Sequence, residues 1–250
     1  MSLAVAVVLC AGFSSCSDDD DEELQNPIEN AGGESSDGND PSNPDTNEYG
    51  IAVSQEVDLG LSVNWAAWNI GATRPEEYGG YYAWGETEEK EEYTWESYKH
   101  CNGTNDTMTK YCLYREYGID DNKAVLEPDD DVAHVKWGNG WRMPTPVEQE
   151  ELKNNCTWTW ITMNGVDGYK VTSKNNGNSI FLPAAGCYDN RPPEWDSLME
   201  DGGQYWSNSL HSYISSDFAC CMTFVSDEID HVSKIAERCF GYSVRAVRAK

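Results

Sequence analysis

The chain has 250 residues and a formal net charge of −27, with 44 acidic residues against 17 basic ones. This excess of acids argues against nucleic acids and anionic lipid surfaces as partners, because both repel a strongly negative protein. Residues 51–250 are long enough for one domain with a sizeable core, and their composition shows no internal break. No apolar stretch in that range approaches the length of a transmembrane helix.

Residues 1–16 are expected to be a lipoprotein signal peptide that ends in the lipid-bearing cysteine. The apolar run SLAVAVVLCAGF is too short to cross a bilayer but has the length of a signal-peptide core. Small residues precede Cys16, as lipoprotein signal peptidase requires, whereas the large Leu9 precedes Cys10. Cys16 is therefore the predicted lipid anchor, with an ordinary cleaved signal and a buried apolar helix as the alternatives. No Lys or Arg precedes the run, so we expect the true start of the protein to lie upstream.

Residues 17–50 are predicted to form a disordered acidic linker. They begin with SDDDDEE, contain twelve acids and no base, and are rich in Gly, Pro, Ser and Asn. Such a segment cannot bury enough apolar surface to fold, and its charges extend it by mutual repulsion. An acidic patch directly after the lipidated cysteine resembles the export signal of Bacteroidetes lipoproteins. This resemblance implies an outer-membrane anchor exposed on the cell surface, and an anchor that faces the periplasm is the alternative.

From residue 51 on, short apolar runs separated by Gly and Asn predict the short strands of a mostly β domain. The pairs Asn164-Gly165 and Asn176-Gly177 are typical of tight hairpin turns between such strands. A terminal strand near residues 243–248 is expected to pair with the first strand of the domain.

Two capping boxes predict helices. Thr73 with Glu76, and Thr145 with Glu148, each place a hydroxyl cap three residues before a carboxylate that can accept the N–H of the cap residue. We therefore expect a short helix after Thr73 and a helix over about residues 146–154. Together with the strands, these helices predict an α+β domain in which two short helices pack on short twisted antiparallel strands.

The tryptophans and cysteines give further expectations. Tryptophans inside apolar runs are predicted to lie in the core, and those in polar loops are candidates for an exposed contact surface. The first group comprises Trp65, Trp68, Trp84, Trp141 and Trp206, and the second Trp95, Trp137 and Trp195. Seven cysteines follow the linker, so at least one must stay unpaired, and Cys101 with Cys112 is the best local disulfide pair.

Five strings resemble a known family and occur in its order over about residues 55–250. They are VDLGLSVNWAAWNIGATRPEEYGGYYAWGE, DDVAHVKWGNGWRMPTPVEQEEL, GYKVTSKNNGNSIFLPAAG, YWSNS and GYSVRAVR. The family is the Fibrobacter-type major paralogous domain of Bacteroidetes surface lipoproteins. The resemblance implies a C-type-lectin-like fold, in the variant shared with formylglycine-generating enzymes. There an RLPT-type stretch opens a helix, matched by residues 142–145, and a strand in which an Arg follows a Gly closes the domain, matched by Gly241 to Arg245.

The chemistry-bearing residues favour a protein that is not an enzyme. The oxidase lineage of this fold needs a pair of C-terminal cysteines for copper, but Cys239 stands alone and SVRAVR has none. Acids are too abundant to single out a catalytic pair, and no histidine lies in a recognisable nucleophile context. No cofactor is expected. Calcium is the one candidate, because Asp129, Asp130 and Asp131 could hold a hard cation, with a solvated loop as the alternative.

We therefore expect a surface-anchored, noncatalytic binding module for a glycan or a protein, using loops near 95–140, 187–204 and 208–242. Segment 208–242 mixes residue types that arise from AAC codons, and C-type-lectin-like domains are the usual scaffold of diversity-generating retroelements. This resemblance suggests a diversified ligand-binding face. A structural or accessory subunit of a surface fibre or complex is the alternative, and a glycan-processing enzyme is a third interpretation. The candidate ligand contacts are Trp195, Tyr213, Ile214, Asp217, Asp230, His231 and Phe240.

Overall fold

The computed structural model describes residues 46–189, 202–211, 215–226 and 228–250, without the side chains of 228–233. These residues belong to one compact unit, Gly38–Lys250. The predicted anchor Cys16 and nearly all of the predicted linker lie outside the described residues, as do Trp195, Tyr213 and Ile214. Within the described ranges, no helix is long and apolar enough to span a membrane.

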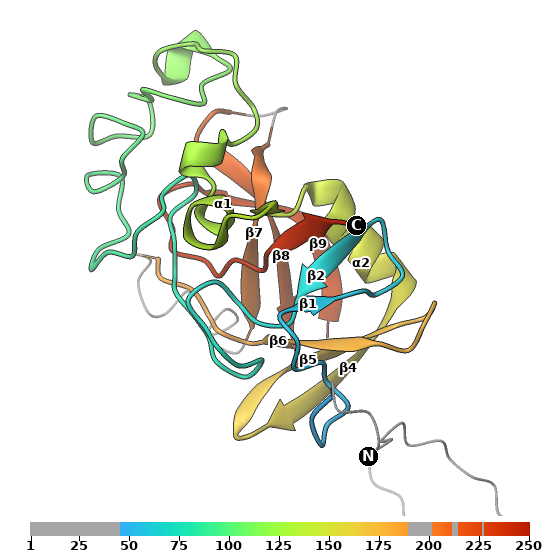
Figure 1. Cartoon of the computed structure of the whole chain (residues 1–250). Coiled ribbons are helices and arrows are strands. Elements are labelled where there is room, and N and C mark those ends of the chain that lie inside the picture. Colours follow the sequence, from blue (N-terminus) through green and yellow to red (C-terminus); the bar gives the residue numbers. More distant parts are fainter. Residues whose placement is uncertain (1–45, 190–201, 212–214, 227) are drawn as a thin grey trace, which may run out of the picture. The chain divides into compact units, whose positions relative to one another are not determined.

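Three small antiparallel sheets and a few short helices make up the fold, which is mixed α and β as expected (Figure 1). The first sheet has the order β1 (Glu56–Val57), β2 (Val63–Ala66), β10 (Val247–Ala249) and β3 (Trp141–Arg142). The second contains β4 (Cys156–Met163), β5 (Val166–Ser173) and β6 (Ser179–Pro183), and the third β7 (Gly203–Leu210), β8 (Phe218–Val225) and β9 (Glu228–Glu237). The helices are α1 (Val132–Trp137), α2 (Pro146–Asn155) and the 3₁₀ turns η1 (Arg115–Tyr117) and η2 (Pro128–Asp130).

The predicted helix after Thr145 is confirmed as α2, which packs against the third sheet. Thr145 Oγ1 accepts the Glu148 N–H at 3.2 Å, and Glu148 Oε2 accepts the Thr145 N–H at 2.8 Å, so both halves of the capping box form. Arg142 donates through both terminal nitrogens to the same carboxylate, at 2.8 and 2.5 Å. The stretch before α2 and the first turn of α2 are thus fixed by one glutamate.

The predicted helix after Thr73 is wrong, because this segment is a turn. Glu77, rather than Glu76, accepts the N–H of Thr73 at 2.7 Å and its hydroxyl at 3.0 Å. The chain then reverses at Gly79, which has a φ of +73° and lies so close to the Ile70 carbonyl that a Cβ would be 2.4 Å away. The segment therefore ends before a helix can propagate.

The predicted turns and the terminal strand are found with differences. Asn164 and Gly165, with φ values of 51° and 83°, form the two-residue turn between β4 and β5. The Asn176-Gly177 turn is a longer loop between β5 and β6. The terminal strand is β10, which is shorter than expected. It pairs with β2, in the first apolar run of the domain, and also with β3, with Val247 opposite Trp65.

A shared core joins the three sheets. One cluster of buried residues contains Trp65 from β2, Tyr169 from β5, and Tyr205 and Phe224 from the third sheet. The core prediction for the tryptophans is confirmed for Trp65, Trp84, Trp141 and Trp206, and Trp68 is partly buried against the core.

Arg245 is a buried cation that connects two sheets. Its guanidinium donates to Asn69 Oδ1 at 2.9 Å, to the carbonyls of Ala66 and Ala67 at 3.1 and 2.8 Å, and to the Phe181 carbonyl of β6 at 2.8 Å. Burial lowers the pKa of Arg245 to about 10, so the side chain stays charged at neutral pH. The arginine that ends the match over residues 241–245 is therefore a structural residue of the core.

The expected disulfide between Cys101 and Cys112 does not form in the structure, where neither of the two is bonded to another cysteine. The Cys101 thiol donates to the carbonyl of Trp95 and the Cys112 thiol to that of Tyr114, both at 3.1 Å. The two thiols therefore have separate backbone partners.

Candidate binding face

Residues 86–131, here called the insert, form an irregular segment at one end of the domain (Figure 1). They contain only the turns η1 and η2 and isolated β-bridges. Loops of this length are uncommon inside a compact domain and are usually functional. The insert includes most of the predicted binding loop 95–140, so its internal contacts determine which surface it presents.

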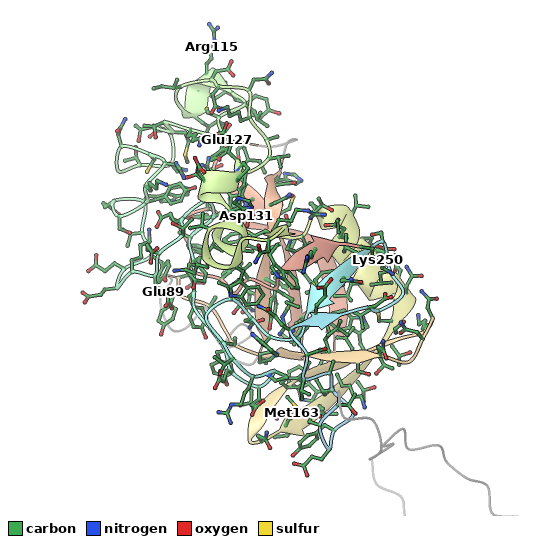
Figure 2. The ribbon with its side chains drawn as sticks, viewed as in Figure 1. Glu89, Arg115, Glu127, Asp131, Met163 and Lys250 are labelled. Atoms are coloured by element: carbon green, nitrogen blue, oxygen red, sulfur yellow. The ribbon has the colours of Figure 1, made fainter. Side chains whose placement is uncertain are left out.

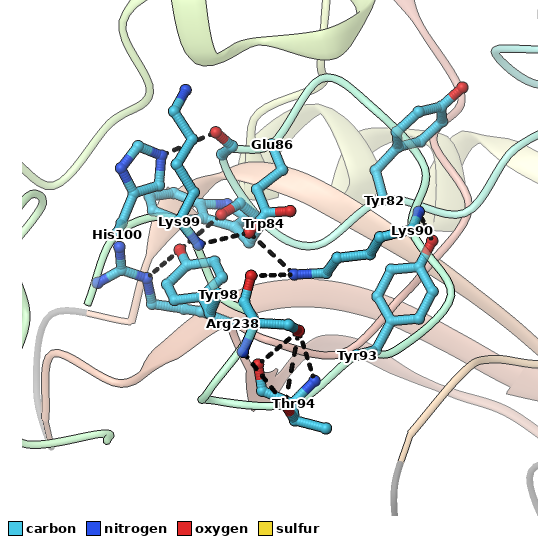
Figure 3. A network of polar contacts seen from close by, with 12 residues as sticks. Tyr82, Trp84, Glu86, Lys90, Tyr93, Thr94, Tyr98, Lys99, His100 and Arg238 are labelled. Atoms are coloured by element: carbon cyan, nitrogen blue, oxygen red, sulfur yellow. Dashed lines mark hydrogen bonds and ion pairs between the residues drawn. The ribbon is translucent and has the colours of Figure 1, made fainter. Parts of the chain in front are cut away.

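Arg238, just after β9, binds the inner side of the insert (Figure 3). Its side chain is fully buried, and it donates to Tyr98 Oη at 2.9 Å and to the carbonyls of Tyr111, Ser216 and Lys110 at 3.0, 2.8 and 3.1 Å. Its guanidinium carbon also lies 5.0 Å from the centre of the Trp84 ring and 5.2 Å from that of Tyr98. One cation thus holds two separate backbone segments and the side chain of Tyr98.

Glu86 organises the beginning of the insert. Its carboxylate, which is nearly buried, accepts the backbone N–H of Lys99 at 2.7 Å and the ammonium of Lys90 at 3.0 Å (Figure 3). Lys90 also donates to the Ser97 carbonyl at 3.2 Å, and Tyr98 Oη donates to the Trp84 carbonyl at 2.6 Å. These bonds close residues 86–99 into a loop that is anchored on the core.

Asp130 holds the other end of the insert. Its carboxylate accepts hydrogen bonds from Lys99 at 2.8 Å, Lys110 at 2.5 Å and Tyr111 Oη at 2.8 Å. Burial alone would raise the pKa of Asp130, but these hydrogen bonds outweigh it and hold the pKa well below its usual range. Burial also lowers the pKa of the neighbouring His100, so that imidazole is neutral at pH 7.

Two of the three acids proposed for calcium, Asp130 and Asp131, already have other partners. Asp130 is bound by two lysines, and Asp131 caps α1 by accepting the N–H groups of Ala133 and His134. Asp131 also accepts the Met143 N–H at 2.8 Å. Across the described residues, no group of three or more His, Cys, Asp or Glu side chains is arranged to hold a metal ion.

Replacing Asp130 by asparagine is expected to lower the free energy of unfolding at pH 7 by about 1–3 kcal/mol, because two ammonium groups and a buried phenol lose a charged acceptor. The pKa of the folded carboxyl lies below the unfolded value of about 3.9, so its contribution is complete above that value and is lost as the pH falls below it. Urea unfolding between pH 2 and 7 measures both effects.

The matched control for this change is Glu88→Gln. Glu88 is 80% exposed and pairs with Lys136 at 3.2 Å, and such surface pairs contribute less than about 1 kcal/mol. The difference in stability between the wild type and the Asp130 variant should shrink toward pH 2. Two pH profiles that stay parallel would contradict this role for Asp130.

Two of the predicted ligand contacts can be placed in full. Asp217 is only 5% exposed; its Oδ2 accepts the side-chain amide of Asn105 in the insert at 2.9 Å, and its carbonyl accepts the Arg238 N–H. The structure therefore corrects its expected role, because this buried carboxylate positions the insert rather than facing a ligand. Phe240 is half-buried against two core clusters.

The remaining predicted contacts are only partly described. Asp230 and His231 lie on β9, where His231 pairs with Thr223 of β8, and their side chains lie outside the described part. Trp195, Tyr213 and Ile214 lie in the ranges that are not described. The structure therefore does not bring the seven predicted contacts together into one described surface.

Two of the three predicted contact tryptophans, Trp95 and Trp137, and many of the described side chains of segment 208–242 are at least partly buried. Trp95 is half-buried and donates to Glu237 at 2.9 Å, and Trp137 packs edge-on against Trp141. Cysteines of the same segment are buried as well, namely Cys220, Cys221 and Cys239. These positions are therefore structural, which leaves less of 208–242 for a diversified face than the sequence suggested.

Sequence reasoning missed the residues that shape the insert. Arg238, Glu86 and Asn105 carry no local motif. The partners of two of them are far away along the chain: Arg238 lies 140 residues from Tyr98, and Asn105 lies 112 residues from Asp217. A lone arginine in an apolar, cysteine-rich stretch was the only available signal.

No protein-family model, no curated protein and no solved structure matches this chain.

Proposed function

We propose that this chain is a surface lipoprotein of the major paralogous family with a C-type-lectin-like domain. In this proposal, Cys16 anchors it in the outer membrane, and the acidic linker extends the domain away from the cell. The support comes from residues 142–145, which precede α2, and from residues 241–245, which end in the buried Arg245. The first stretch leads directly into a helix, and the second comes just before the terminal strand β10.

We further propose that the domain is a noncatalytic module that binds a glycan or a protein with the exposed side of the insert. The observation that carries this proposal is the fixation of an irregular surface segment by buried charges, with Arg238 in the middle and Glu86 and Asp130 near the ends. A loop that is already ordered does not lose that conformational entropy when a ligand binds, so a rigid insert favours recognition.

The exposed apolar side chains of the insert give a direct test. Ile119 is 64% exposed and Val125 51% exposed, so replacing each by serine should leave the core intact. We expect the protein to bind at least one ligand on an array of mucin glycans and polysaccharides, or one protein in a library of defined surface proteins. The Ile119→Ser and Val125→Ser variants should bind it at least about fivefold more weakly, about 1 kcal/mol.

Val147→Ser is the matched control, because Val147 is 77% exposed on α2, outside the insert. Binding that is equal in all three variants would place the ligand elsewhere and would contradict a role for the insert. Repeating the measurement with a chelator also tests calcium dependence.

A further inference from the structure

We propose that a groove between residues 74–78 and the β4–β5 turn binds a neutral saccharide. The groove has a volume of about 510 Å³, within the range of about 300–1,000 Å³ that is typical of small-molecule sites. Its lining combines one aromatic ring, one aliphatic side chain and four polar side chains, namely Tyr78, Val166, Arg74, Glu76, Glu77 and Asn164. The two walls come from segments almost ninety residues apart in the sequence.

The groove is separate from the insert. Met163, which directly precedes the β4–β5 turn, and Arg115 in the insert lie at opposite ends of the view in Figure 2. None of the residues that line the groove belongs to segment 86–131 or to segment 208–242. A ligand in the groove would therefore occupy a second site, whatever the insert binds.

The polar groups of the groove are held in defined positions. Glu76 Oε1 accepts the Asn164 side-chain amide at 3.0 Å, which joins the two walls. Arg74 donates to Glu77 Oε1 at 3.1 Å, and its Nη1 lies 3.7 Å from Glu76 Oε1. Glu77 is fixed in turn by the N–H and hydroxyl of Thr73. Planar carboxylate, amide and guanidinium groups thus stand side by side before any ligand arrives.

The exposed side of this cluster retains hydrogen-bonding capacity. The Arg74 side chain is 67% exposed, and a guanidinium has five N–H donors, more than its glutamate partners use. The Glu77 side chain is 35% exposed and offers acceptor positions to the same space. The groove can therefore donate and accept hydrogen bonds with a ligand that has adjacent hydroxyl groups.

Tyr78 supplies the apolar part of the groove. It is 43% exposed, an unusual position for a large ring, and its backbone is fixed because its carbonyl accepts the Asn69 amide at 2.8 Å. Asn69 is itself held by the buried Arg245. An aromatic face beside fixed polar groups matches a pyranose, which has a face of C–H groups and a rim of hydroxyls.

The charges of the groove select against other ligands. Two carboxylates face one guanidinium, and the whole chain carries −27, so acidic saccharides and phosphates are repelled. A purely apolar ligand would leave the polar rim without partners, which costs binding energy. A neutral sugar can pack its C–H face on the Tyr78 ring and form hydrogen bonds with the polar side chains.

Calorimetric titration of the full chain tests this proposal with defined probes. The neutral probes are tetramers of β-1,4-linked glucose, β-1,4-linked N-acetylglucosamine and α-1,6-linked mannose; the charged probes are tetragalacturonic acid and tetralysine. We expect at least one neutral tetramer to bind with a Kd of about 0.1–1 mM. Tyr78→Ala and Glu76→Gln should each weaken that binding about tenfold, and Tyr78→Phe should retain it because the ring remains.

The controls separate this site from the insert. Val147→Ala should bind as the wild type does, and thermal unfolding of every variant shows whether it is folded. The proposal is overturned if no neutral tetramer binds, if a charged probe binds in their place, or if binding survives both Tyr78→Ala and Glu76→Gln. Saccharide binding that is lost in Ile119→Ser but kept in Tyr78→Ala would overturn the groove and support the insert.

Discussion

Replacing Arg245 by methionine is expected to lower the free energy of unfolding by about 3–5 kcal/mol. Methionine fills a similar volume but leaves the carbonyls of Ala66, Ala67 and Phe181 and the Asn69 side chain without their donors. Removing a buried cation also removes its desolvation cost, which is why some buried charges can be replaced without loss. Here the four acceptors remain buried, so the loss of their hydrogen bonds dominates.

Chemical unfolding monitored by tryptophan fluorescence measures this effect. Arg245→Lys keeps the charge, but a single ammonium cannot serve acceptors on both β2 and β6, so we expect an intermediate loss. Arg248→Met is the control from the adjacent strand β10, because Arg248 is 40% exposed and pairs with Glu56 at the surface. An equal loss of unfolding free energy in the Arg245 and Arg248 variants would show that the buried hydrogen bonds of Arg245 do not stabilise the domain.

Replacing Arg238 by methionine is expected to cost a similar amount, about 3–5 kcal/mol, but with a local signature. The side chain donates to the carbonyls of Tyr111, Ser216 and Lys110 and to Tyr98 Oη, and it lies on the Trp84 ring. Three of these partners, Tyr98, Lys110 and Tyr111, lie in the insert. We therefore expect the insert of this variant to unfold locally before the sheets unfold.

Hydrogen exchange resolves this difference. In Arg238→Met, amides of residues 98–112 should exchange at least about tenfold faster than in the wild type, while those of β5 should change only with global stability. Arg115→Met is the matched control, because Arg115 is 88% exposed within the same insert. If the amides of the insert and of β5 accelerate together, Arg238 stabilises the whole domain and not the insert in particular.

Local sequence signals predicted local structure well. Thr145 and Glu148 interact within one turn, so the capping box needed no knowledge of the rest of the fold. The turn at Asn164-Gly165 is another case, because the left-handed conformation it requires is accessible to these two residue types. The same capping signal failed at Thr73, where the chain reversal at Gly79 and the contact of Glu76 with Asn164 are tertiary effects.

Long-range contacts explain what the sequence could not show. The α+β class followed from the alternation of apolar runs and turns, but the order of the strands depends on pairings such as Val247 with Trp65. The residues of the candidate binding face could not be predicted reliably, because the sequence does not show which side chains are buried. Asp217 was expected at the surface and is only 5% exposed. The saccharide groove was missed because its walls, around Glu76 and Asn164, meet only after the domain has folded.

The position of β10 also affects when the domain can fold during synthesis. β10 lies between β2 and β3, and its Val247 pairs with Trp65 roughly 180 residues earlier in the chain. A ribosome adds about 5–20 residues per second, so β10 is made roughly 10–40 s after β2. During that time the first sheet is incomplete and the strand edge of β2 is open to chaperones. The first sheet is therefore completed only after the strands of the other two sheets have been made.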